Sequence, residues 1–156
     1  MKRKGRRYVS YGKSIILVKC NQQKKWDPHY PHTKVARALF TSVASWLGVG
    51  KKTRELRIFV AIGTPLDLFH GVDLFFEYRH QIVTIDLKLK PRKGIKAHFL
   101  ITLEDIRENR YYQISREIAS ELNKKVEEEK ILRRKREDFE VQRIRQELDA
   151  QEKMAG

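Results

Sequence analysis

The sequence has little cysteine: Cys20 is the single one among 156 residues. It therefore cannot form a disulfide within the chain or supply the several thiolates that a structural zinc site uses. Long apolar runs are also missing. The run near the N-terminus, residues 15–18, is far shorter than a signal-peptide core or the roughly 20 residues of a membrane span. These absences predict a protein of a reducing, intracellular compartment.

Acidic residues are missing from the first part of the chain, where nine lysines and arginines precede Asp27. The whole chain has 34 Lys and Arg against 20 Asp and Glu, a formal net charge of +14. Residues 121–156 contain ten of each kind, so the whole excess lies in residues 1–120, as 24 against 10. Neutralising phosphates releases condensed counterions, so this excess favours a polyanionic partner.

Aromatic residues alternate with the N-terminal positive charges, at Tyr8, Tyr11 and Trp26. This combination suits phosphate contact together with base stacking, and it predicts nucleic-acid binding in the cytoplasm or at the nucleoid. The alternative is a solvated basic tail that aids solubility. The residues expected to contact the nucleic-acid backbone here are Arg3, Arg6, Arg7, Lys24 and Lys25.

The chain has no internal repeat and no long Ser, Gly or Pro linker, and its 40% hydrophobic content is enough for one core. We expect a basic arm over residues 1–13, one domain over residues 14–126 and a charged helical tail over residues 127–156. Mixed charges and scattered apolar positions leave three forms open for the tail. It is a lone solvated helix, a helix that pairs with a partner, or a fraying end.

Hydrophobic spacing predicts an α/β order of elements. We expect a strand at residues 14–20, a loop at 21–32, and a helix at 34–47 capped by Thr33, with Phe40 and Trp46 on its core face. Strands follow at 56–62, 72–78 and 82–89, with a tight turn at 79–81, and a further strand is expected at 96–102. The helical pattern then resumes at Leu103, after Thr102.

Two of these strands alternate apolar and polar residues, so Asp73, Asp86 and Lys88 fall on their polar faces. If the strands pair as a hairpin, two carboxylates and an ammonium converge on one patch. Carboxylate oxygens suit a hard divalent cation, which polarises a phosphodiester and activates water, while a lysine offsets charge on the phosphorus oxygens. The pattern therefore predicts hydrolysis of a nucleic-acid backbone. The simpler interpretation is a polar sheet face with a cross-strand ion pair.

The order of helix, strand, strand with Asp73, strand with Asp86-Leu87-Lys88 and helix resembles the PD-(D/E)xK nuclease superfamily, over about residues 33–126. This superfamily includes restriction endonucleases, Holliday-junction resolvases and repair nucleases. The resemblance implies a restriction endonuclease-like α/β core, with a mixed central sheet flanked by helices, followed here by the long charged C-terminal helix. It also implies Mg²⁺ or Mn²⁺ held by Asp73 and Asp86, and a water positioned by Lys88.

The sequence departs from the family pattern in two places. The first motif reads Gly-Val-Asp in place of Pro-Asp, and the helix before the sheet lacks the acidic residue that many members have. Candidates for a third metal-binding carboxylate are Glu77 and Asp67, and Glu55 is a less favoured one. Directly after the motif strand, Lys90, Arg92 and Lys93 are expected to contact the nucleic-acid backbone.

The sequence thus predicts a metal-dependent endonuclease that acts on nucleic acid, with DNA ahead of RNA, and that dimerises to cut two strands. The alternative from a different class is a noncatalytic basic nucleic-acid-binding protein, associated with ribosomes or a mobile element. His29 and His32 lie near Asp27 with a metal-like spacing, but they lack further ligands and are assigned a loop role. His70 lies near the proposed site in the sequence and is a weaker candidate for phosphate contact.

Overall fold

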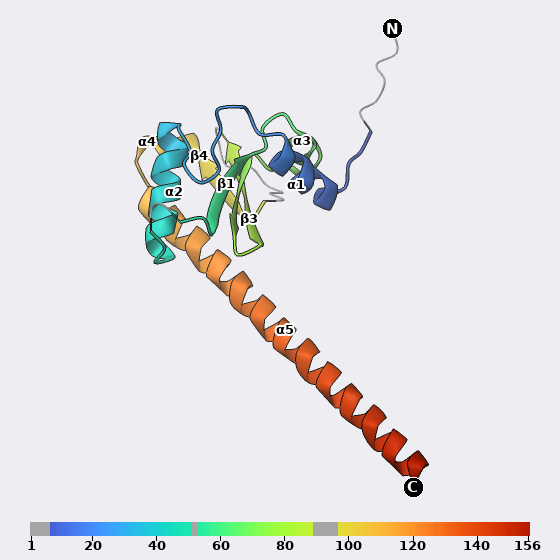
Figure 1. Ribbon diagram of the computed structural model, residues 1–156. Coiled ribbons are helices and arrows are strands. Elements are labelled where there is room, and N and C mark those ends of the chain that lie inside the picture. The colour runs from blue at the N-terminus through green and yellow to red at the C-terminus, as the bar shows by residue number, and fades with distance from the viewer. Residues whose placement is uncertain (1–6, 51–52, 89–96) are drawn as a thin grey trace. The chain divides into compact units, whose positions relative to one another are not determined.

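The computed structural model describes residues 7–50, 53–88 and 97–156 (Figure 1). The chain forms two compact units, residues 1–122 and residues 123–156. Within the described ranges, no helix is both long and apolar enough to cross a membrane. Five residues expected to contact nucleic acid lie outside those ranges: Arg3, Arg6, Lys90, Arg92 and Lys93.

The first unit contains a mixed four-stranded sheet, which confirms the α/β class. Strands β1 (Leu56–Val60), β2 (Leu74–Tyr78) and β3 (Gln81–Lys88) are antiparallel neighbours, and β4 (Phe99–Thr102) is parallel to β3. The hairpin between β2 and β3 has a two-residue turn, Arg79-His80, with φ angles of 47° and 66°. These left-handed conformations match the twist of the strands, although neither residue is the usual Asn or Gly.

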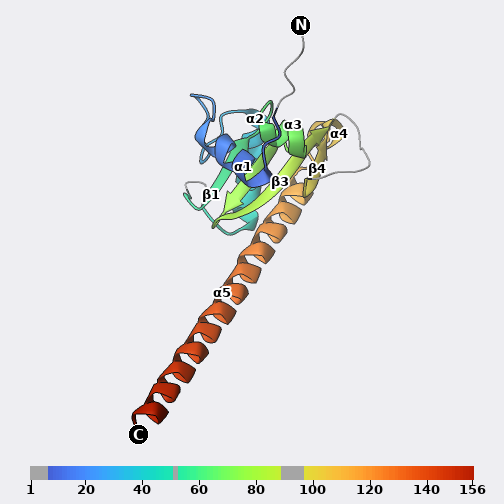
Figure 2. The same cartoon turned by 90° about the vertical axis from the view of Figure 1, so that its right-hand side faces the viewer.

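Helices cover both faces of the sheet. Helix α2 (Lys34–Trp46) lies on one face, and α1 (Tyr11–Cys20) and α3 (Pro65–His70) lie on the other (Figures 1 and 2). Phe40 is buried, as expected, but the core position expected for Trp46 is wrong. Its side chain is 37% exposed at the helix end, and its ring packs against Tyr112 with centroids 4.8 Å apart. Thr33 is at the N-cap of α2, but its side chain makes no capping hydrogen bond.

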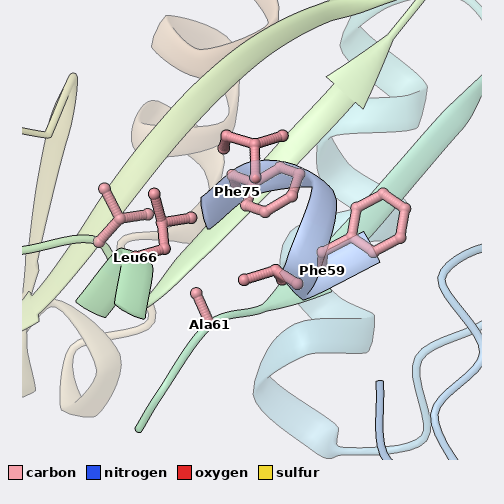
Figure 3. Packing of buried hydrophobic residues seen from close by; sticks show 7 residues of the cluster. Phe59, Ala61, Leu66 and Phe75 are labelled. Carbon is pink, nitrogen blue, oxygen red and sulfur yellow. The ribbon is translucent and has the colours of Figure 1, made fainter. Parts of the chain in front are cut away.

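The expected strand at residues 14–20 is wrong, because this segment is the helix α1. A short apolar run of this kind fits either structure, and its setting decides. Ile15 and Val18, one helical turn apart, are buried with Phe59 and Phe75 in the core on this side of the sheet (Figure 3). The helix also begins at Tyr11, three residues inside the expected N-terminal arm.

The C-terminal part of the chain is helical, as expected, but the helix is interrupted once. Thr102 and Asp105 form a reciprocal capping box at the start of α4 (Leu103–Arg107). Asn109, with φ at 52°, separates α4 from α5 (Tyr111–Ala155). Within the first unit, α5 buries Ile118 and Leu122. The second unit is the remainder of α5, so residues 127–155 form a charged helix as expected.

Candidate functional site

The register of β2 and β3 places Asp73 next to Asp86. Leu74, at the start of β2, pairs with Ile85 of β3, and the Asp73 amide donates to the Ile85 carbonyl over 2.9 Å. Neighbouring side chains on one sheet face have Cβ atoms about 5 Å apart. Both carboxylates are buried, Asp73 at 8% and Asp86 at 6% exposure. The predicted convergence of the two carboxylates is therefore present in the structure.

The closeness of the two carboxylates changes the acidity of Asp73. The pKa of Asp73 is raised to about 6, and burial is the largest cause. A hydrogen bond with the Asp86 side chain and the charges of Asp67 and Asp86 also raise this pKa, while the Leu87 amide opposes the rise by donating to Asp73 Oδ2 over 2.7 Å. Two buried carboxyl groups that face each other hold a shared proton or a cation more easily than two full negative charges.

Lys88 completes the patch, as its spacing from Asp86 predicted. Its Nζ lies 3.0 Å from Asp86 Oδ1, and its side chain is 32% exposed while that of Asp86 is 8% exposed. Asp86 Oδ1 is buried and makes no hydrogen bond with the described residues, so the nearby Lys88 ammonium offsets its charge.

Asp67 and Glu77, the candidates for a third carboxylate, have different settings. Asp67 lies in the first turn of α3, accepts from the Gly63 amide over 2.8 Å, and is close enough for its charge to raise the pKa of Asp73. Glu77 lies four residues beyond Asp73, a distance of roughly 13 Å along a strand. It forms ion pairs with Lys19 and Arg57. The structure therefore brings Asp67, and not Glu77, toward the carboxylate pair.

Glu55 is not near the pair either, because its Oε2 accepts from Arg79 Nε over 3.1 Å beside the β2–β3 turn. Within the described parts of the chain, no three or more His, Cys, Asp or Glu residues form a group that could hold a metal ion. The candidate site thus has two buried carboxylates, Asp73 and Asp86, and one ammonium, that of Lys88.

The side chains of His70 and His32 have structural partners. His70 shares a 2.9 Å hydrogen bond with the Val9 carbonyl, so it fastens the segment before α1. His32 contacts the ring of Trp26, and the backbone amide of His29 donates to Asp27 Oδ1, consistent with a loop role for this cluster. Three expected nucleic-acid contacts are exposed on the described surface: Arg7, Lys24 and Lys25.

Two features near the site were missed by the sequence analysis. One is α3, which begins after Thr64 with Pro65 and ends at Gly71 with φ at 65°. A proline in the first turn and a glycine just after the end are a recognisable helix signature. The other is His98, whose Nδ1 lies 3.0 Å from the Thr84 amide and 2.8 Å from its hydroxyl. No pattern in the sequence indicated that pairing.

Comparison of the chain with family models, curated proteins and solved structures finds no match.

Proposed function

We propose that this protein is a metal-dependent endonuclease of the PD-(D/E)xK type, acting on nucleic acid. The observation that carries the proposal is the burial of Asp73 and Asp86 side by side, with Lys88 ion-paired to Asp86. An ordinary polar sheet face would have these side chains in solvent or paired one to one with opposite charges. Two adjacent buried carboxylates with one partly exposed lysine suit chemistry better than stability.

The residues present fit a hard divalent cation. Asp73 and Asp86 are buried side by side, and the pKa of Asp73 is raised in part because Asp86 faces it. A cation held by the two carboxylates would offset this repulsion. Asp73 and Asp86 would hold Mg²⁺ or Mn²⁺, which supplies polarisation of a phosphodiester oxygen and lowers the pKa of bound water.

The protein side chains have separable roles in this proposal. Asp73 is oriented by the Leu87 amide, which fixes its Oδ2. Lys88, with its side chain partly exposed, orients the attacking water and offsets the negative charge that builds on the phosphorus oxygens. Arg7, Lys24 and Lys25 contact the sugar-phosphate backbone without reading its sequence.

The arrangement of elements supports the restriction endonuclease-like fold as part of the same proposal. A helix precedes three antiparallel strands, and a fourth strand is parallel to the third. Asp86 and Lys88, the two motif residues that face the patch, lie at the end of the third strand. Cleavage of both strands of DNA would take two sites, so we expect a homodimer on duplex substrates.

The test uses the full chain with supercoiled plasmid, branched DNA and structured RNA, each with Mg²⁺, with Mn²⁺ and with a chelator. We expect cleavage that requires the metal and that falls by on the order of 100-fold in Asp86→Asn and in Lys88→Met. Asp149→Ala, an exposed carboxylate of α5, is the matched control and should cleave like the unaltered chain. Binding to each substrate, measured in chelator, should survive all three changes.

A second candidate function is noncatalytic binding of nucleic acid. It is favoured by the charge of +14 and by a groove on α2 whose lining includes Lys34, Arg37, Trp46 and Tyr112, a mixture of cations and aromatic rings. Salt-sensitive binding without cleavage of any of the three substrates would support this second function and overturn the first.

A further inference from the structure

A cavity of about 340 Å³ lies at the carboxylate end of the sheet, on the opposite face. Its walls come from the loop before α2, from α2 itself, from the segment after β1 and from the ends of β2, β3 and β4. None of the described residues that line it is Asp, Glu, Lys or Arg, although 35% of the chain is charged. The volume is in the range of roughly 300–1,000 Å³ that is typical of small-molecule pockets.

One residue connects the cavity with the proposed catalytic site. The Leu87 amide donates to Asp73 Oδ2, while its side chain lines the cavity on the other face of β3. Leu74, the residue after Asp73, lines the cavity as well. Ile62 is 61% exposed and Val35 is 37% exposed, so apolar side chains of the wall also face solvent. The cavity and the carboxylates are thus separated by a single sheet layer.

The lining suits a flat, uncharged ligand with polar edges. The Trp26 indole donates to the Ile58 carbonyl over 2.9 Å, which holds one aromatic wall in place. Gln23 and Thr33 supply polar side chains to the lining, and the Thr33 hydroxyl makes no capping hydrogen bond to α2. Apolar and aromatic walls with a few polar groups are what a heterocyclic base requires.

The residues next to the lining in the chain are mostly cationic. Lys24 and Lys25 directly precede Trp26, Asp27 follows it, and Lys34 directly follows Thr33; the three lysines are exposed and form no ion pair with the residues that the structure describes. Lys34 also lines the neighbouring groove on α2, which shares His32 with the cavity. An uncharged cavity with lysines adjacent to its lining in the chain matches a neutral base attached to a chain of phosphates.

We propose that this cavity holds one unstacked nucleobase of the strand whose phosphodiester lies at Asp73 and Asp86. The inference rests on the proposed function, because it takes a nucleic-acid strand as the substrate of the carboxylate site. The enzyme then binds single-stranded or locally opened nucleic acid, and the base in the cavity sets which phosphodiester meets the carboxylates.

The experiment compares two seven-unit chains of equal charge, one wholly abasic and one with a single base at its centre. Binding of the full protein is measured by fluorescence anisotropy at fixed salt in chelator, with deoxyribose and ribose chains as separate arms. We expect the base to strengthen binding by roughly ten-fold in the preferred arm. Ala36→Leu, which fills the cavity, should reduce this preference to less than about two-fold. Ala150→Leu, an exposed alanine of α5 that lines neither the cavity nor the groove on α2, should keep it.

A second pair of variants tests the cavity independently, in case Ala36→Leu disturbs folding. Ile62→Ser changes an exposed wall residue of the cavity and should lower the preference to about three-fold. Ile16→Ser, at 62% exposure against 61% for Ile62, is its control and should leave the preference unchanged. Equal binding of the two chains by the unaltered protein, or a preference that survives both cavity variants, would overturn the base pocket.

The outcome is distinguishable from that of the nuclease proposal. Metal-dependent plasmid cleavage without any base preference would leave the nuclease standing and remove the pocket. A preference that the cavity variants abolish, in a protein that cleaves none of the three substrates, would establish the pocket and remove the nuclease.

Discussion

Asp73 and Glu77 lie on the same face of the sheet, four residues apart, and both are buried, at 8% and 3% exposure. Their partners are opposite in charge. Glu77 forms ion pairs with Lys19 and Arg57, whereas Asp73 faces a second carboxylate, Asp86. The charge of Glu77 is thus neutralised by cations of the protein itself. Asp73 is held in an environment that raises its pKa to about 6.

This difference separates a carboxylate that forms two ion pairs from one for which we propose a catalytic role. Glu77 fastens α1 to two strands, since Lys19 belongs to α1 and Arg57 to β1. Asp73 forms no ion pair with the described residues, and its closeness to Asp86 raises its pKa. Sites built for chemistry commonly retain such unfavourable arrangements. The comparison predicts opposite signs for substitutions at the two positions.

The largest expected effect is at Glu77. Glu77→Ala leaves Lys19 and Arg57 without their shared partner beside the Phe59 ring, which both cations overlie. We expect a loss of about 3 kcal/mol in the free energy of unfolding, the low end for breaking a buried ion pair because both partners are partly exposed. Urea unfolding measures this loss. Glu55→Ala is the control: its pair with Arg79 is about half exposed, so it should cost less than about 1 kcal/mol.

The next effect has the opposite sign. Asp73→Asn removes one of two facing negative charges while keeping an oxygen for the Leu87 amide. We therefore expect the free energy of unfolding to rise by about 1–2 kcal/mol at pH 8 in chelator. Cleavage should be lost in the same variant. Added Mg²⁺ should raise the melting temperature of the unaltered chain but not that of Asp73→Asn. A loss of stability on this substitution would show that Asp73 is structural, like Glu77.

The pH dependence of the same variant sharpens the comparison. Because the folded-state pKa of Asp73 is raised from 3.8 to about 6, the native state retains a proton that the unfolded chain releases. The stability due to this group is full below pH 3.8 and is lost as the pH rises through 6. The difference in the free energy of unfolding between the unaltered chain and Asp73→Asn, measured from pH 3.5 to about pH 8, isolates the contribution of Asp73. A difference that does not change with pH would contradict the raised pKa of Asp73.

The smallest effect concerns Asp105, a carboxylate outside the site, at the start of α4. Its pKa is lowered by hydrogen bonds from the Thr102 amide and hydroxyl. Its contribution is present above its ordinary pKa and is lost as the pH falls through the lowered value, which is the reverse of Asp73. Thr102→Ala removes the capping box and should cost about 1 kcal/mol at pH 7. Thermal unfolding at pH 7 and in acid should show the cost shrinking as Asp105 becomes protonated.

The sequence was sufficient wherever spacing along the chain determines the outcome. Alternation of apolar and polar residues predicted the strand that contains Val83 and Ile85, and Thr102 indicated the start of a helix. It failed where packing decides between equal local choices. Residues 14–20 are as apolar as a strand, yet they form a helix because Ile15 and Val18 fit the core beside Phe59. Trp46 has a core spacing, but its helix ends there and its ring packs on Tyr112 instead.

The candidate site shows the same division. The amino-acid sequence was enough to identify the residue types: Asp73 on one predicted strand, and Asp86 and Lys88 two residues apart on the next, within a basic chain. Their partners depend on the folded chain, because strand register pairs residues that are distant in sequence. That register brought Asp73 to Asp86, carried Glu77 away to Lys19 and Arg57, and placed Leu87 between the carboxylates and a cavity on the far face.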